Sequence, residues 1–169
     1  MNIIYLHGLG SNQGGEKVSF LSDKGYVFAP EMEYNHNENL FEELLNEIKT
    51  EHLPPDLIIG SSMGGYFAYM LASHFENTPV LLFNPAFHSR SINPNNIYKG
   101  PFEVKGVIAL GNEDNVINPE RTIKLLEERE ELDNFEIINM EEIGHQIPLY
   151  MFRNIYKKLE EGNDHNSEI

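Results

Sequence analysis

The sequence predicts an α/β fold, with a mostly parallel sheet of about six strands flanked by helices. Short apolar runs alternate with helical patterns along nearly the whole chain, which is typical of parallel strands joined by crossover helices. Several of these runs are apolar throughout, as expected for strands that are buried on both faces. The 169 residues are the usual size of one domain. We therefore expect one domain over residues 1–160, and a polar tail over 161–169 that is predicted to be disordered.

Six short apolar segments are the candidate strands: Ile3–Leu6, Tyr26–Ala29, Leu57–Ile59, Val80–Phe83, Val104–Leu110 and Phe135–Asn139. The last segment alternates apolar and polar residues, so it is predicted to lie near an edge of the sheet. Apolar residues at helical spacing predict helices that begin at Leu40, after Ser62, at Pro119 and at Pro148. The segment 84–100 is rich in Asn, Pro and Ser, does not fit the alternation, and is predicted to form a short cap.

The composition excludes several kinds of function. There are 12 Lys and Arg against 27 Asp and Glu, a formal charge of −15, so neither nucleic acid nor an anionic membrane is an expected partner. The absence of cysteine excludes disulfides, thiolate zinc sites and cysteine nucleophiles, and no cofactor or metal ion is expected. The first apolar run has no basic leader and is far shorter than the roughly 18 residues of a spanning helix, which favours the cytoplasm. The oligomeric state is left open.

The strongest motif is Gly60-Ser61-Ser62-Met63-Gly64, directly after a candidate strand and before a helical pattern. It fits G-x-S-x-G, in which a sharp strand-to-helix turn exposes a nucleophilic serine at the top of a parallel sheet. Glycine two positions before and two after the serine avoids a collision between a side chain and the neighbouring backbone. Only Ser62 has glycine at both of these positions, so Ser62 is the candidate nucleophile.

A serine hydroxyl is a weak nucleophile unless a base takes its proton and a carboxylate orients that base. In an α/β-hydrolase the acid and then the histidine follow the serine, each in a loop after a later strand. Asp114 follows the candidate strand that ends at Leu110 and is the candidate acid, with Glu113 in reserve. His145 lies just before the final helix and is the candidate base.

Attack on a carbonyl also requires N–H donors for the oxyanion that forms. The backbone N–H of Met63, the residue after the nucleophile, is one candidate donor. The other is assigned to Leu9, because glycines on both sides of it allow close approach of the loop after the first strand. Phe87 and Ile147, together with these two residues, are predicted to line an acyl pocket.

Five motifs together resemble the small bacterial α/β-hydrolases of the YqiA/YcfP esterase type: Tyr5-Leu6-His7-Gly8, Gly60-Ser61-Ser62-Met63-Gly64-Gly65-Tyr66, Asn84-Pro85-Ala86, Asp114-Asn115-Val116 and Gly144-His145. The resemblance covers essentially residues 1–160. It implies a compact hydrolase fold that lacks the first strands of larger relatives, a Ser-Asp-His triad, and esterase or thioesterase activity on acyl substrates. Asn112 and Glu113 lengthen the approach to Asp114 relative to the family pattern.

We therefore expect a serine hydrolase that cleaves small acyl esters or thioesters. The formal charge of −15 predicts that uncharged esters are better substrates than the polyanionic esters of coenzyme A. One alternative is a silent interaction protein with the same fold, although every part of a catalytic site has a candidate residue. A nucleotide-binding module is a weaker alternative, because Gln13 stands where a Rossmann fingerprint that begins at Gly8 needs its third glycine.

Overall fold

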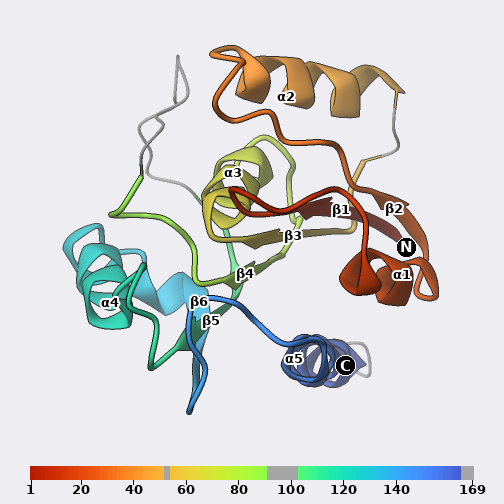
Figure 1. Ribbon diagram of the computed structural model, residues 1–169. Coiled ribbons are helices and arrows are strands. Elements are labelled where there is room, and N and C mark those ends of the chain that lie inside the picture. The colour runs from red at the N-terminus through yellow and green to blue at the C-terminus, as the bar shows by residue number, and fades with distance from the viewer. Residues whose placement is uncertain (52–53, 91–102, 165–169) are drawn as a thin grey trace.

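The computed structural model describes residues 1–51, 54–90 and 103–164, and its centre is a six-stranded sheet (Figure 1). All neighbouring strands are parallel, and their order is β2-β1-β3-β4-β5-β6. The strands are β1 (Asn2–Leu6), β2 (Tyr26–Phe28), β3 (Leu57–Ser61), β4 (Val80–Phe83), β5 (Gly106–Gly111) and β6 (Phe135–Met140). The α/β class is confirmed, and β6 lies at an edge, as its alternating sequence predicts.

Helices cover both faces of this sheet (Figure 1). One face carries α2 (Leu40–Glu51), α3 (Met63–Ala72) and α4 (Pro119–Glu128). The other carries α1 (Glu16–Ser22) and α5 (Leu149–Asp164), and a short 3-10 helix, Leu132–Asn134, precedes β6. Among the described residues, no helix combines the length and the apolar character needed to cross a membrane.

The strands supply side chains to both layers, because successive residues of a strand point to opposite faces. In β1, Ile4 and Leu6 belong to the apolar cluster under α2 and α3, whereas Ile3 and Tyr5 belong to the cluster under α1 and α5. The ten residues of α3 are all buried, which fits a helix that is apolar on nearly every side. The turn between β3 and α3 is therefore fixed to the best-packed part of the molecule.

Most predicted elements agree with the structure to within two residues at each end, and three departures matter here. Helix α1 is not predicted, because its apolar residues, Val18, Phe20 and Leu21, span only one turn and give no clear helical period. Strand β5 begins at Gly106, two residues after the predicted start, and α5 continues to Asp164, beyond the predicted domain boundary at residue 160. A Lys157–Glu161 pair at 3.7 Å supports this last stretch of helix. Positions 91–102 of the predicted cap and 165–169 of the predicted tail lie outside the described residues.

Candidate active site

Ser62 lies in a strained turn between β3 and α3. Its φ of 54° and ψ of −118° are values that side-chain-bearing residues rarely adopt. The Ser62 N–H donates to the carbonyl of Phe83 in β4 at 2.9 Å, which holds the turn against the sheet. A Cβ at Gly60 would lie 2.3 Å from the oxygen of Gly64, and one at Gly64 would lie 2.1 Å from the oxygen of Leu6. Both glycines are therefore required for the turn to close.

Three predicted site residues meet at the carboxyl edge of the sheet. The Oγ of Ser62 lies 3.0 Å from Nε2 of His145. The Nδ1 of the same ring lies 2.7 Å from Oδ2 of Asp114. The Asp114 side chain is fully buried, whereas that of His145 is 24% exposed. A hydrogen-bonded chain thus runs from a buried carboxylate through an accessible imidazole to the serine hydroxyl.

Two further contacts fix the carboxylate. Oδ1 of Asp114 accepts hydrogen bonds from the N–H groups of Val116 and Ile117, each at 2.8 Å, while Oδ2 faces the histidine. With Nδ1–H donating to the carboxylate, Nε2 of His145 is left as an acceptor for the serine O–H, a tautomer assigned from these partners. Glu113 is exposed, so the geometry selects Asp114 from the two carboxylates that the sequence offered.

Asn84 holds the histidine loop in place. Its Nδ2 donates to the carbonyls of Gly144 and His145, both at 3.1 Å, and its Oδ1 accepts from the N–H of Gly111 at 2.8 Å. The side chain is 1% exposed, and the backbone φ is 43°, in the left-handed region that asparagine tolerates better than most residues. No role is predicted for Asn84 from the sequence, although an asparagine directly after a buried strand is a signal of a polar function at that edge.

The loop after β1 lies directly against the serine turn. A Cβ placed on Gly8 would be 3.1 Å from Cβ of Ser62. His7 is buried, with Nδ1 2.9 Å from the carbonyl of Gly8, and its Nε2 accepts from the Met32 N–H at 3.3 Å. The Tyr34 O–H donates to the carbonyl of His7 at 2.6 Å. Burial raises the pKa of Tyr34, so the phenol keeps the proton that it donates.

The two residues predicted as oxyanion donors border this turn. Met63 is the first residue of α3, where backbone N–H groups have no carbonyl partner within the helix. Leu9 follows Gly8 in the loop that touches Ser62, and its side chain is 49% exposed. The assignment of their N–H groups to an oxyanion stays a prediction.

The two predicted substrate-binding residues have different surroundings. Phe87 is 2% exposed, and its ring centroid lies 5.0 Å from that of Tyr69, so its side chain belongs to the core. Ile147, two residues after His145, lines a cavity of about 500 Å³. The other lining residues come from β1, the loop after it, the start of α1 and the start of α5: Tyr5, His7, Gly10, Ser11, Asn12, Gly14, Glu16, Lys17, Pro148 and Leu149.

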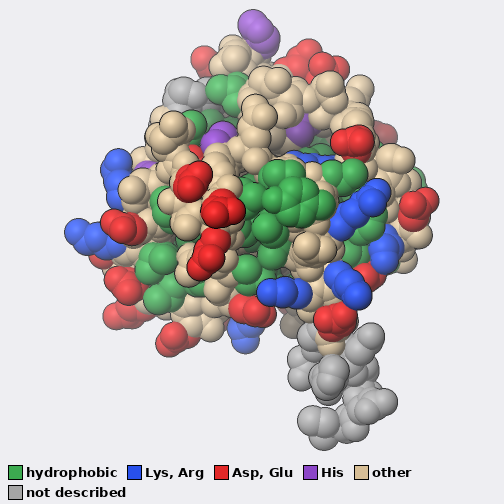
Figure 2. Space-filling view, turned by 60° about the horizontal axis from the view of Figure 1, so that its bottom comes forward, with side chains coloured by type: hydrophobic (Ala, Val, Ile, Leu, Met, Phe, Trp, Pro, Cys, Tyr) green, Lys and Arg blue, Asp and Glu red, His purple; other side chains and the backbone are tan. Residues whose placement is uncertain are grey.

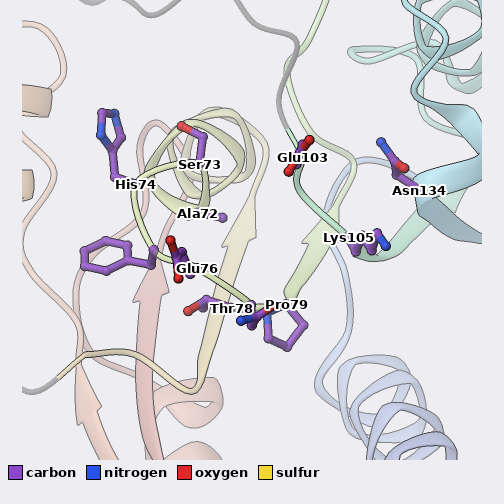
Figure 3. A pocket seen from close by; sticks show the side chains of 11 residues that line it. Ala72, Ser73, His74, Glu76, Thr78, Pro79, Glu103, Lys105 and Asn134 are labelled. Atoms are coloured by element: carbon purple, nitrogen blue, oxygen red, sulfur yellow. The ribbon is translucent and has the colours of Figure 1, made fainter.

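A larger cavity, of about 960 Å³, lies at the opposite edge of the sheet (Figure 3). Thr78 and Lys105, which precede β4 and β5, help to line it, together with His74 at the end of α3. Burial, and secondly the charge of Lys49, lower the pKa of His74. This cavity lies at the amino ends of β4 and β5, whereas Ser62, Asp114 and His145 lie at the carboxyl ends of the strands, where ligands of parallel sheets usually bind. Within the described ranges, no three His, Asp or Glu side chains form a group that could hold a metal ion.

The parallel sheet, the strained serine turn after β3 and the order serine, acid, histidine define an α/β-hydrolase fold. The chain belongs to the uncharacterised protein family UPF0227, whose family model matches residues 2–166. The comparison with curated proteins found no match.

Solved structures support the same fold. An alpha/beta hydrolase enzyme from the metagenome of sediments of the Mar Chica lagoon in Morocco is 17% identical, with a TM-score of 0.68 over 96% of this chain and 91% of that chain. A structure from Nitrososphaera gargenis, reported in a study of carboxylesterases, is 15% identical, with a TM-score of 0.69 over 97% and 91%. The monoacylglycerol lipase of Paleococcus ferrophilus is 14% identical, with a TM-score of 0.66 over 94% and 92%. At these identities the likeness concerns the fold.

Proposed function

We propose that the protein is a serine hydrolase that cleaves carboxylic esters or thioesters through an acyl-enzyme intermediate. The observation that carries this proposal is the pair of contacts at His145, 3.0 Å to Oγ of Ser62 and 2.7 Å to Oδ2 of Asp114. A strained backbone at Ser62 adds support, because such conformations cluster at functional sites. The relatives with the same fold include a lipase and a structure from a study of carboxylesterases, which is consistent with this chemistry.

In the first half-reaction, Oγ of Ser62 attacks the acyl carbonyl carbon while Nε2 of His145 accepts the hydroxyl proton. The carbonyl oxygen becomes an oxyanion, for which the N–H groups of Leu9 and Met63 are the proposed donors. His145 then gives its proton to the leaving alcohol or thiol, and the acyl group remains on the serine. Asp114 keeps the imidazole in the correct tautomer and stabilises its charged form.

In the second half-reaction, a water molecule takes the place of the leaving group. His145 accepts a proton from this water, and the oxygen attacks the acyl carbon bound to Ser62. Collapse of the second tetrahedral intermediate releases the carboxylic acid and returns the proton to the serine. The proposed setting is the cytoplasm, with a small acyl ester as the substrate. Neither nucleic acid nor a membrane is a proposed partner, because the formal charge of −15 repels anionic surfaces.

The test measures hydrolysis of 4-nitrophenyl acetate and of a matched acetyl thioester by the wild type and by Ser62→Ala. We expect kcat to fall by at least about 10³-fold in this variant, because the nucleophile is lost. Ser61→Ala is the matched control, since Ser61 ends β3 next to the turn, and it should keep most of the activity. An equally active Ser62→Ala protein would contradict the proposal. A folded wild type that cleaves neither substrate would favour the silent interaction protein.

A further inference from the structure

A cavity of about 500 Å³, lined in part by His7 and Ile147, has the size of a small-molecule site. Two of its lining residues adjoin the proposed catalytic groups along the chain. His7 precedes Gly8, which lies against Ser62, and Ile147 follows His145 by two residues. A substrate whose carbonyl lies at Ser62 can therefore extend into this cavity.

Lys17 places a positive charge at the wall of the cavity. It lies in the first turn of α1, and its Nζ lies 5.6 Å from the centroid of the Phe152 ring. Among the described residues, no carboxylate forms an ion pair with Lys17, whereas Lys24 at the other end of the same helix pairs with Glu160 at 3.1 Å. Lys17 is half-buried, and this burial lowers the pKa of its ammonium group.

The surroundings of Lys17 differ from the acidic average of the chain. Figure 2 shows several Lys and Arg side chains beside an apolar patch, on a surface of a protein whose formal charge is −15. The contacts on the α1 and α5 side agree with this picture, since Lys17, Lys24 and Arg153 each lie over an aromatic ring. Lys24 is paired with Glu160, so near the cavity it is Lys17 that attracts an anion, although the whole chain repels one at long range.

The single ammonium of Lys17 limits how many negative charges a ligand of the cavity can carry. Among the described residues, Lys17 alone brings an ammonium to the cavity, and the exposed carboxylate of Glu16 lies at its wall as well. Ser11 and Asn12 add neutral polar groups, while Tyr5, Ile147 and Leu149 supply apolar surface. This combination suits a short apolar chain that ends in a single anionic group, and it disfavours a polyanion.

We propose that the preferred substrate is an acyl ester or thioester that carries one anionic oxygen group, a carboxylate or a phosphate, which binds against Lys17 in this cavity. The inference rests on the proposed hydrolase function and names its substrate class. It revises the expectation that uncharged esters are the best substrates, and it keeps the exclusion of polyanionic ones. Lys17 is not predicted as a site residue, because the short helix α1 that carries it gives no clear periodic signal.

The test compares esters that differ only in one charge. Mono-4-nitrophenyl adipate and its neutral terminal amide place the charge on the acyl part. The ester 4-acetoxybenzoate and its amide place it on the leaving group, and 4-acetoxyphenyl phosphate replaces the carboxylate by a phosphate. For each, kcat/KM is measured with the wild type, Lys17→Met, Lys17→Arg and the control Lys124→Met. Lys124 lies on α4 with a side chain that is 73% exposed, so its removal changes the net charge equally but not the cavity.

In at least one arm, we expect Lys17→Met to lower kcat/KM for the anionic ester by about tenfold, mainly through KM, while the neutral partner changes little. Lys17→Arg should keep most of the preference, and Lys124→Met should keep all of it. Folding of each variant is checked by its urea midpoint. The arm that responds identifies the half of the substrate that carries the charge.

Two failures are distinguishable. If the wild type cleaves the neutral esters but Lys17→Met leaves every charged-to-neutral ratio unchanged, the inference is overturned and the hydrolase function stands. If the wild type cleaves no ester, the hydrolase function fails. The substrate assignment then fails with it, and the dissociation constant of 4-acetoxybenzoate tests the anion site alone. Weaker binding by Lys17→Met than by Lys124→Met would support an anion site at Lys17, and equal binding would overturn it.

Discussion

Replacement of Asn84 tests whether the histidine loop is held by one buried amide. The side chain joins the end of β4 to the end of β5, through the Gly111 N–H, and to the carbonyls of Gly144 and His145. No described element other than the loop itself carries His145, so its ring position depends on how this loop is anchored. We compare Asn84→Gly with Asn84→Ala, because glycine adopts the left-handed backbone freely and alanine does not.

The magnitude follows from three hydrogen bonds and one backbone angle. Each buried hydrogen bond contributes about 1 kcal/mol net, so Asn84→Gly should lower the free energy of unfolding by about 3 kcal/mol. Asn84→Ala loses the same bonds and also holds a non-glycine residue at a φ of 43°, which costs about 1 kcal/mol more. The alanine variant should therefore be the less stable of the two.

The free energy of unfolding is measured by urea titration, and kcat and KM are measured with 4-nitrophenyl acetate at a temperature where both variants are folded. We expect kcat to fall by at least about tenfold with little change in KM, because displacement of His145 affects proton transfer more than binding. Asn84→Asp keeps the acceptor for Gly111 but loses both donors, so its kcat should fall as well. A loss below about 1 kcal/mol in Asn84→Gly, with normal kcat, would refute the reasoning.

Three further predictions concern the acid, the turn and the phenol. Asp114→Asn should lower kcat by orders of magnitude, whereas Glu113→Gln should change kcat little. If steady-state kinetics show the reverse, Glu113 and not Asp114 is the catalytic acid. Gly64→Ala should cost about 3 kcal/mol of unfolding free energy, because its Cβ would lie 2.1 Å from the oxygen of Leu6. Gly14→Ala, whose nearest contact is at 3.8 Å, is the control and should cost less than about 0.5 kcal/mol. Tyrosine in an unfolded chain titrates near pH 10, and burial raises the pKa of Tyr34, so stability should be full below about pH 10 and fall as the pH rises above it. Urea midpoints between pH 9 and 11 should fall less in Tyr34→Phe, and an equal fall in both proteins would contradict this.

The strands and the serine turn could be predicted because their signals are local. Buried parallel strands are apolar throughout, and G-x-S-x-G combines steric need with chemistry in five residues. The position after β5 limits the candidate acid to two neighbouring carboxylates, Asp114 and Glu113. The structure distinguishes the two, because the Asp114 side chain contacts His145 whereas the Glu113 side chain is exposed to solvent.

Other features depend on contacts between distant parts of the chain. The bonds of Asn84 reach residues 27, 60 and 61 positions away, and no spacing rule points to them. Phe87, which is predicted to line an acyl pocket, packs against Tyr69 in the core, and its contact with a substrate stays a prediction. Lys17 lies on a helix too short to give a periodic signal, and its proposed role depends on a cavity lined by β1, the loop after it and the first residues of α1 and α5.

The most direct test of the account is the site at which a fluorophosphonate reacts, because only a serine activated by a neighbouring base and an oxyanion site reacts readily with this electrophile. The wild type is treated with the reagent, the intact mass is measured, and the modified peptide is mapped by tandem mass spectrometry. We expect one adduct, on Ser62, that is absent from Ser62→Ala and much slower to form in His145→Ala. An unreactive wild type, or an adduct that persists in Ser62→Ala, would contradict the claim that Ser62, His145 and Asp114 form a catalytic triad.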